Sequence, residues 1–166
     1  MPHARQGSSS VEINGKIYVI GGFVTQPFAK DTNEVWAYDP NDETWTQKTN
    51  MPTIRNGMSV SVLEGKIYVM GGFNFNIGLT ALSTFDVYDP LNDKWDITQN
   101  MPDAVGSHCA AIINKRIYRV GGMGVATKAD TITHIVYEYN PFTQPSTSVS
   151  PASKLLEQWG SIKSVR

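Results

Sequence analysis

The sequence repeats itself with a period of 50 residues. The stretch "MPTIRNGMSVSVLEGKIYVMGG" at 51–72 follows "MPHARQGSSSVEINGKIYVIGG" at 1–22 and precedes "MPDAVGSHCAAIINKRIYRVGG" at 101–122. The Met-Pro pairs, the Gly-Gly pairs and a tyrosine coincide in all three copies. Repetition at about 40 to 50 residues is typical of propellers and related arrays. We therefore expect three similar units, at about 1–50, 51–100 and 101–143.

Each unit has the pattern of four short strands. The first is small and β-branched, and the second ("KIYVI", "KIYVM", "RIYRV") is apolar on both faces, as in a strand covered on both sides. Asn14-Gly15 between these strands predicts a hairpin, because both residues tolerate positive φ. The third strand ends in "YDP", and the fourth carries Trp45 or Trp95.

The unit resembles the Kelch repeat. The shared features are a Gly-Gly pair that closes the second strand, a tyrosine within that strand, and a tyrosine and a tryptophan downstream. The resemblance covers residues 1–143 and implies an all-β fold of Kelch-type β-propeller blades, with three repeats of four-stranded antiparallel sheets. We expect Trp45 and Trp95 to be buried between blades. We expect the Gly pairs to let the backbone pass close to its neighbour.

The third unit departs from this pattern. Its "YNP" is shifted by one residue, and Ser146 stands where the tryptophan is expected, within a segment rich in Pro, Ser and Thr. Arg119 replaces the Val19 and Val69 of the other units. We therefore expect an incomplete third blade and an irregular C-terminal tail over 144–166, in which "KLLEQW" forms a short helix or lies across an exposed sheet.

Three units are too few to close a ring, because propellers typically have about 4 to 8 blades. The sheets of the first and third units would each keep one face uncovered. Two explanations stand at this point: a missing remainder of the propeller, or self-association of two copies into six blades.

Antiparallel connectivity predicts where a binding surface would lie. The loops after the Gly pairs and the "MPxxR" connections share one rim, and these loops differ most between units. A constant scaffold with variable loops is typical of a binding surface. Arg5 and Arg55 enter this rim, with Phe28, Phe75 and Asn76 in the loops beside them.

Arg5 and Arg55 have two interpretations. As exposed cationic forks they would bind an acidic ligand, and the resemblance implies partner contacts for arginines so placed. Replacing an exposed Arg55 by alanine would then change stability by less than about 0.5 kcal/mol. Alternatively, each arginine caps the carbonyls of a neighbouring blade or forms a salt bridge. The third unit has Val105 at this position.

The function that we expect is a non-catalytic protein-interaction module whose rim binds a protein partner such as an acidic peptide segment. The alternative is a sugar- or small-acid-binding enzyme of the Kelch-type epimerase (mutarotase) class. The sequence has no P-loop, nucleophile elbow, CxxC or HExxH motif. His108 and Cys109 are adjacent on a predicted strand, so their side chains point to opposite faces. We expect no cofactor and no metal.

The composition gives no reason to expect a nucleic-acid or membrane partner. The net charge is −1, with 14 basic and 15 acidic residues, which gives no electrostatic reason to expect nucleic acid or a membrane surface. No apolar run approaches the roughly 20 residues of a membrane span. Cys109 is the single cysteine, so there is no intrachain disulfide. A soluble protein is expected, with the cytoplasm as the favoured compartment.

Overall fold

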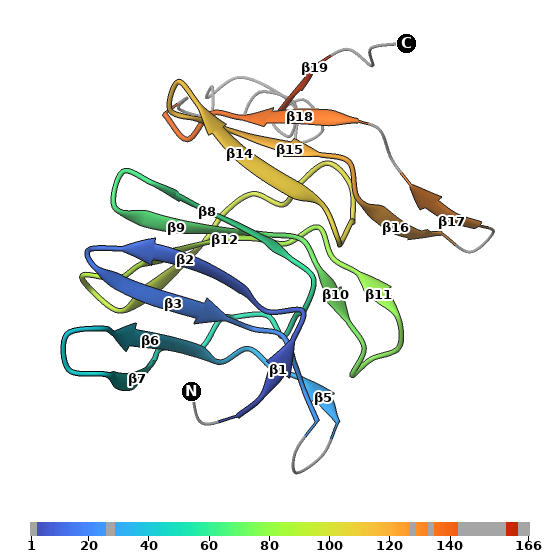
Figure 1. The fold of residues 1–166 in the computed structure, drawn as a ribbon. Helices are drawn as coiled ribbons and strands as arrows, with labels where there is room; N and C mark the ends of the chain where they lie inside the picture. Colours follow the sequence, from blue (N-terminus) through green and yellow to red (C-terminus); the bar gives the residue numbers. More distant parts are fainter. Residues whose placement is uncertain (1–2, 26–28, 127–128, 133–134, 143–158, 163–166) are drawn as a thin grey trace.

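Three four-stranded antiparallel sheets are stacked in chain order (Figure 1). The structure is a computed structural model that describes residues 3–25, 29–126, 129–132, 135–142 and 159–162. No helix occurs in these ranges. The all-β class and the four-stranded blades predicted from the repeat are confirmed.

The strands of each blade follow one another from the inside of the stack to the outside. Blade 1 consists of β2 (Ser9–Ile13), β3 (Lys16–Ile20), β6 (Val35–Asp39) and β7 (Thr44–Lys48). Blade 2 consists of β8 (Ser59–Leu63), β9 (Lys66–Met70), β12 (Phe85–Asp89) and β13 (Lys94–Ile97). Blade 3 consists of β14 (Cys109–Ile113), β15 (Arg116–Val120), β18 (Val136–Tyr139) and β19 (Trp159–Ile162). The first strands of neighbouring blades, β2, β8 and β14, are in contact.

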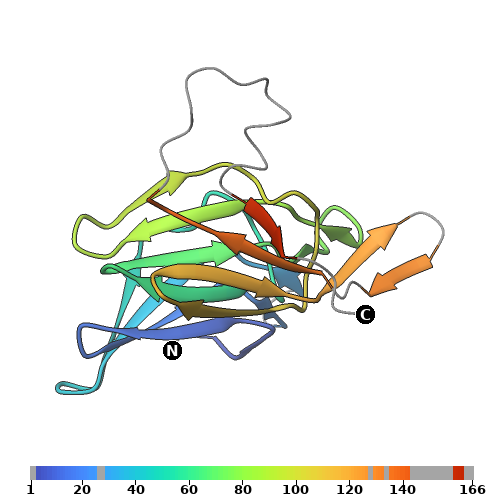
Figure 2. The ribbon, with the colours of Figure 1, turned by 90° about the horizontal axis from the view of Figure 1, so that it is seen from above.

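Short hairpins continue from one end of each blade. They are formed by β4 (Phe23–Val24) with β5 (Lys30–Asp31), β10 (Phe73–Asn74) with β11 (Thr80–Ala81), and β16 (Met123–Ala126) with β17 (Ala129–Ile132). A further short strand, β1 (Arg5–Gln6), pairs with β4. Seen from above, the three sheets overlie one another and the β16–β17 hairpin projects beyond one edge (Figure 2).

The hydrophobic core consists of two layers, one in each space between blades. The layer between blades 1 and 2 brings Tyr18, Ile20 and Val35 against Met51, Ile67, Val69 and Tyr88. The layer between blades 2 and 3 repeats the pattern with Tyr68, Met70 and Phe85 against Met101, Val105, Ile117 and Tyr139. Because each layer uses the same positions of two successive repeats, one sequence pattern generates every blade contact.

Trp45 and Trp95, which we expected to be largely buried, are half-buried. Each lies on the outermost strand and packs on the tyrosine paired with it, at 4.9 Å between ring centroids for both Tyr38–Trp45 and Tyr88–Trp95. The Trp95 Nε1–H donates to the Thr49 carbonyl of blade 1 at 2.8 Å. An outermost strand has no further strand beyond it, so one side of each indole meets solvent.

Blade 3 is completed by β19, which contradicts the expected irregular tail at 159–162. Trp159 pairs with Tyr139 in the same register that joins Trp45 to Tyr38 and Trp95 to Tyr88. Counting one period forward from Trp95 and adding the one-residue shift of the third unit leads to Ser146, but the fourth strand begins only at Trp159. The segment "KLLEQW", for which a short helix was one expectation, spans 154–159: residues 154–158 lie outside the described residues, and Trp159 begins strand β19.

The Gly-Gly pairs lie where the next blade enters. Gly71 has φ +55°, and a Cβ there would lie 2.3 Å from the Val105 carbonyl oxygen of blade 3. The Gly72 N–H donates to that same carbonyl at 2.9 Å. Glycine is therefore required twice, for the left-handed backbone and for the close approach of the next blade.

This requirement is testable with two Gly→Ala substitutions. Gly71→Ala should destabilise the fold by about 3 kcal/mol or more, because backbone strain of about 1–3 kcal/mol is joined by a clash with a backbone oxygen. Gly65→Ala is the matched control, since Gly65 has φ +73° with nothing within 4 Å of an added Cβ, and it should show the strain alone. Equal losses of unfolding free energy in urea would contradict the close-approach argument.

Candidate functional site

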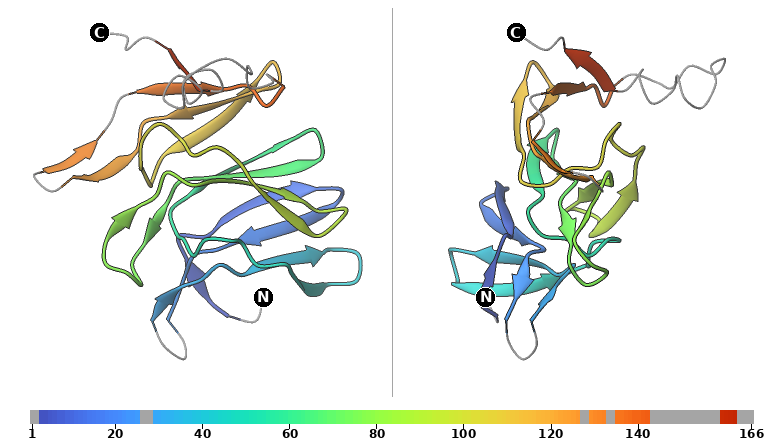
Figure 3. Two further views of the ribbon diagram at one scale, coloured as in Figure 1. Left: turned by 180° about the vertical axis from the view of Figure 1, so that it is seen from behind. Right: turned by 90° about the vertical axis from the view of Figure 1, so that its right-hand side faces the viewer.

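The variable loops and the connections between blades meet on one rim, as predicted. The residue after each arginine position pairs with the first residue of the hairpin: Gln6 with Phe23, Asn56 with Phe73, and Gly106 with Met123. The hairpins β10–β11 and β16–β17 extend to the same side of the stack (Figure 3). This surface, made by the three hairpins and the connections that pair with them, is called the rim below.

Arg55 does not lie open on this rim. Its exposed fraction is 0%. The guanidinium forms an ion pair with Asp86 of strand β12, which is also buried, and donates to the carbonyls of Gly71 and Thr84 at 3.3 and 3.2 Å. The interpretation of Arg55 as an exposed fork is therefore wrong. The salt bridge of the alternative interpretation is present, but the carbonyls that Arg55 caps belong to its own blade and not to a neighbouring one.

Burial and charge pairing act in opposite directions on the pKa values of Arg55 and Asp86. Burial lowers the pKa of Arg55 and raises the pKa of Asp86, while the attraction between the two charges opposes both shifts.

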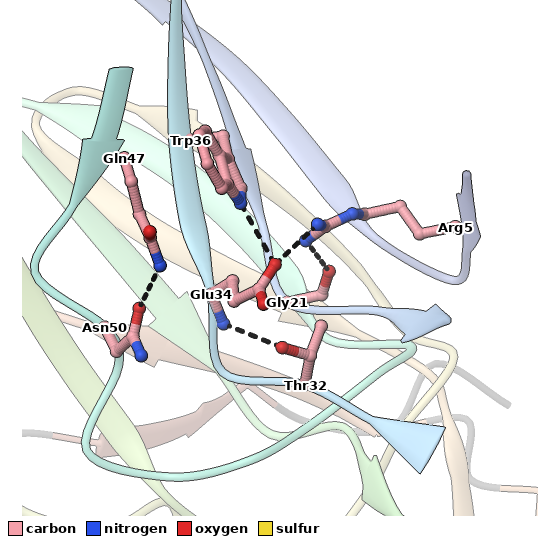
Figure 4. A network of polar contacts seen from close by, with 7 residues as sticks. All are labelled: Arg5, Gly21, Thr32, Glu34, Trp36, Gln47 and Asn50. Atoms are coloured by element: carbon pink, nitrogen blue, oxygen red, sulfur yellow. Dashed lines mark hydrogen bonds and ion pairs between the residues drawn. The ribbon is translucent and has the colours of Figure 1, made fainter. Parts of the chain in front are cut away.

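Arg5 makes the corresponding contacts in blade 1 (Figure 4). Its side chain has no exposed surface and pairs with Glu34 at 2.8 Å, and its second terminal nitrogen donates to the Gly21 carbonyl at 3.3 Å. Trp36 Nε1–H donates to the same Glu34 carboxylate at 3.0 Å. Burial alone would raise the pKa of Glu34, but the hydrogen bonds from Trp36 and Arg5 outweigh it and lower this pKa.

Blade 3 reaches the same arrangement from another residue. Arg119, on the second strand, is fully buried, donates to the Gly121 carbonyl at 3.0 Å and pairs with Asp103 at 3.1 Å. Its guanidinium also lies 4.7 Å from the centroid of the Tyr137 ring, a favourable cation–π arrangement. Arg119, which breaks the repeat, thus supplies the guanidinium that Val105 cannot.

A cavity of about 350 Å³ opens on the rim between blades 1 and 2. Its lining is Gln6, Gly7, Phe23, Asn56 and Phe75. A second hollow of about 190 Å³ adjoins it and shares Gln6 and Phe23. None of the five lining residues carries a charged side chain. We call the larger space the rim cavity.

The identity of one residue explains why this cavity is open. In blade 3 the position of Asn56 is occupied by Gly106, and the buried Phe73 ring of blade 2 lies where a Cβ of Gly106 would be, 2.2 Å away. Asn56 carries a side chain at that point, and the equivalent Phe23 of blade 1 remains half-buried. Phenylalanine thus fills the space between blades 2 and 3 and leaves it open between blades 1 and 2.

A buried carboxylate fixes the cavity wall. Asp31, at the end of hairpin β4–β5, accepts the Asn56 Nδ2–H at 2.7 Å and the Phe75 backbone N–H at 2.5 Å. The Asn76 amide exchanges hydrogen bonds with the Asp31 backbone, accepting at 2.9 Å and donating at 3.1 Å. Asn76 therefore braces the two hairpins against each other.

Of the five residues predicted for the site, Phe75 has the geometry of a ligand contact. It lines the cavity, is 46% exposed, and stacks on Phe73 with ring centroids 6.2 Å apart. Arg5 touches the smaller hollow, but its guanidinium is paired internally. Phe28 lies outside the described residues. The sequence analysis did not predict Gln6, Phe23 and Asn56 as site residues. The available signal was their position: Phe23 directly follows a Gly pair, and Gln6 and Asn56 directly follow the arginines of the connections.

The described part of the chain contains no cluster of side chains with the make-up of a metal site. No group of three or more His, Cys, Asp or Glu side chains able to hold a metal ion occurs there, and no helix in that part could span a membrane. Two amides, a glycine and two aromatic faces can bind a ligand by stacking and hydrogen bonding, and the lining contains no acid or base.

His108 is buried away from the rim cavity. Its Nε2 lies 2.7 Å from the Ser59 hydroxyl, and its Nδ1 is buried without a hydrogen-bond partner among the described residues. Burial, assisted by the nearby positive charge of Arg119, lowers the pKa of His108 to about 4. The imidazole is therefore neutral at pH 7.

Comparisons with known proteins agree with the fold. The family model described as KLHDC2/KLHL20/DRC7 Kelch-repeats domain matches residues 1–154. A solved structure titled "Structure of YjhT" superimposes with a TM-score of 0.77 at 18% identity, covering 97% of this chain and 52% of that one. At this identity the likeness shows the fold alone, and the chain spans about half the length of that protein. No curated protein sequence matches the chain.

The buried arginine predicts a large stability effect. Arg55→Met should cost about 3–5 kcal/mol, because it leaves the Asp86 charge buried without its partner. Lys115→Met is the control: it removes the ion pair with Glu64 from a lysine whose side chain is 71% exposed, and it should cost about 1 kcal/mol or less. Urea unfolding followed by tryptophan fluorescence measures both. A loss below about 0.5 kcal/mol for Arg55→Met would restore the exposed-fork interpretation.

His108 predicts how stability depends on pH. Between its ordinary pKa of 6.5 and its folded pKa of about 4, the unfolded chain binds a proton that the folded chain does not. Acidification through this window should therefore reduce the free energy of unfolding by about 1.4 kcal/mol per pH unit.

The control is His108→Met, which copies the Met58 of blade 2. There the Ser9 hydroxyl donates to the Met58 carbonyl at 2.6 Å, so Ser59 has the same option in the variant. The difference in stability between wild type and variant should grow in favour of the variant from pH 6.5 to 4.5. Parallel pH profiles would show that His108 titrates normally in the folded state.

Proposed function

Because the chain belongs to the KLHDC2/KLHL20/DRC7 Kelch-repeats family, in which protein binding is typical, we propose that it is a non-catalytic interaction module. Its partner is an extended polypeptide segment that places a side chain in the rim cavity. The observation that carries this proposal is the rim cavity itself, open between blades 1 and 2 and lined by aromatic and amide groups.

The size and lining of the cavity support a small apolar anchor. Binding pockets begin at about 300 Å³ and are lined by apolar groups with a few polar ones, a description that fits the rim cavity. Phe75 offers an exposed ring at its edge, and aromatic anchors often dominate the binding energy of an interface. The exposed side chain of Gln6 can donate to and accept from a peptide backbone.

The chemistry of the partner differs from the acidic peptide that two rim arginines would select. The guanidinium groups of Arg5 and Arg55 are buried against Glu34 and Asp86, so their charges are compensated within the blade. We therefore propose an uncharged segment with an apolar or aromatic side chain. A sugar-binding enzyme of the epimerase class is the competing function.

The test selects linear peptides on the wild-type protein from a displayed random library. The selected peptides should bind Phe75→Ala at least about tenfold more weakly, since an anchor ring is worth more than about 1 kcal/mol. Leu91→Ala is the control, because Leu91 is 83% exposed in the β12–β13 turn on the opposite rim. Gln6→Ala should weaken binding with no change in melting temperature.

Two outcomes would overturn the proposal. One is a selection that yields no peptide binder, and the other is a set of binders that distinguish Leu91→Ala but tolerate Phe75→Ala. A parallel thermal-shift titration with sialic acid addresses the competing enzyme: a stabilisation lost in Phe75→Ala would place a sugar in the cavity instead of a peptide.

A further inference from the structure

The stack of blades has two uncovered faces. On blade 1, Ile17 is 42% exposed, whereas the equivalent Ile67 and Ile117 are fully buried against the preceding blade. On blade 3, Val120 is 45% exposed, whereas the equivalent Ile20 and Met70 are fully buried against the following blade. We call the side of a blade that faces the preceding blade its entry face and the side that faces the following blade its exit face. The two uncovered faces are thus the entry face of blade 1 and the exit face of blade 3.

Each face carries the residues that form blade contacts inside the molecule. The exit faces of blades 1 and 2 use Ile13, Tyr18, Ile20 and Val35, and Leu63, Tyr68, Met70 and Phe85. Blade 3 places Ile113, Tyr118, Val120 and Val136 at these positions.

The entry faces of blades 2 and 3 use Ile67 and Tyr88, and Ile117 and Tyr139. Blade 1 places Ile17 and Tyr38 there. The two open faces therefore have the chemistry of the two sides of one interface.

Backbone polarity is complementary in the same direction. At the inner edge the Gly57 N–H donates to the Gly7 carbonyl and the Ser107 N–H donates to the Gly57 carbonyl, both at 2.8 Å. This series of hydrogen bonds between successive blades therefore begins with the Gly7 N–H, a donor in blade 1, and ends with the Ser107 carbonyl, an acceptor in blade 3. Similarly, the Gly22 and Gly72 N–H groups donate to a carbonyl of the following blade, and Gly122 presents the next N–H of this kind.

We propose that a second copy of this chain covers both faces, with the exit face of blade 3 packed on the entry face of blade 1 of the partner. This contact continues the interface already repeated twice within the chain. Head-to-tail contacts form a closed ring when the rotation closes, and otherwise form filaments. Two copies give six blades, within the range of known propellers. The chain also matches about half of a longer chain with this fold.

The charged residue on the exit face does not oppose this packing. Glu138 stands where Ala37 and Val87 are buried in the other blades. Its carboxylate is paired within blade 3, with Arg116 and with the Tyr118 hydroxyl at 2.9 Å. The carboxylate would thus enter the interface with its partners in place. The proposal is independent of what the rim cavity binds.

The test is the mass of the 166-residue chain in solution, measured by light scattering during gel filtration. The expected mass is twice the chain mass of 18.3 kDa. Val120→Asp and Ile17→Asp should each raise the dimer dissociation constant by at least about 100-fold, because each buries an unpaired charge in both contacts. Leu91→Asp, with the same charge on an exposed turn, should remain dimeric. Circular dichroism confirms that each variant is folded.

Mixing the two monomeric variants distinguishes the geometry. A Val120→Asp copy retains an intact entry face and an Ile17→Asp copy retains an intact exit face, so their mixture should associate through one good contact. A dimer that uses the same face twice would lose association only in one variant and would gain nothing on mixing.

Alkylation of Cys109 provides a second measurement. Cys109 is exposed in the single chain and occupies the position of Ser9 and Ser59, whose hydroxyls contact the following blade at Met58 and His108. Its alkylation should be at least tenfold slower at dimer-forming concentrations than in Val120→Asp. A folded monomer, a ladder of larger species, or a dimer unaffected by both aspartates would overturn the proposal.

Discussion

Every blade contains a buried guanidinium that donates to the carbonyl of the first glycine in the Gly-Gly pair. The acceptors are Gly21, Gly71 and Gly121, and the donors are Arg5, Arg55 and Arg119. That carbonyl lies at the turn where the second strand ends, so the arginine fixes the backbone at the place where the next blade must approach. An arginine suits this position because its planar fork can bind a carboxylate and a backbone carbonyl together.

The same interaction is built from different residues in each blade. The acid is Glu34, Asp86 or Asp103, and in blade 3 the arginine itself moves from the connection to the second strand. The position of the guanidinium beside the glycine carbonyl is therefore the same in each blade, although the residue that supplies it differs in sequence position. Because the arginine charges are paired within the blades, the rim cavity is lined by aromatic and amide groups. The difference between Asn56 and Gly106 determines that this cavity lies between blades 1 and 2 and not between blades 2 and 3.

Much of the fold followed from the repeat, and less of the site did. The Gly pairs, the paired tyrosines and the Asn14-Gly15 hairpin, whose two residues have φ of 54° and 75°, act locally, so their spacing predicted strands, turns and the shared rim. The burial of Arg55 depends on Asp86, which lies 31 residues later, and the position of Trp159 depends on the length of the segment before it. Both features depend on contacts between segments that are distant in the sequence, and the repeat pattern does not show these contacts. Asp86, the first aspartate of "TFDVYDP", lies on a largely apolar strand and was the one available sign of the buried pair.

The most direct test of the arginine arrangement is nitrogen-15 NMR of the arginine side chains in the unliganded protein. A guanidinium held by a carboxylate and a carbonyl cannot rotate freely about its Nε–Cζ bond. Arg5, Arg55 and Arg119 should therefore each give two resolved terminal nitrogen signals with slow exchange of their protons with water. A single averaged signal with fast exchange for Arg55 would show that its guanidinium is free at the rim and would contradict this account.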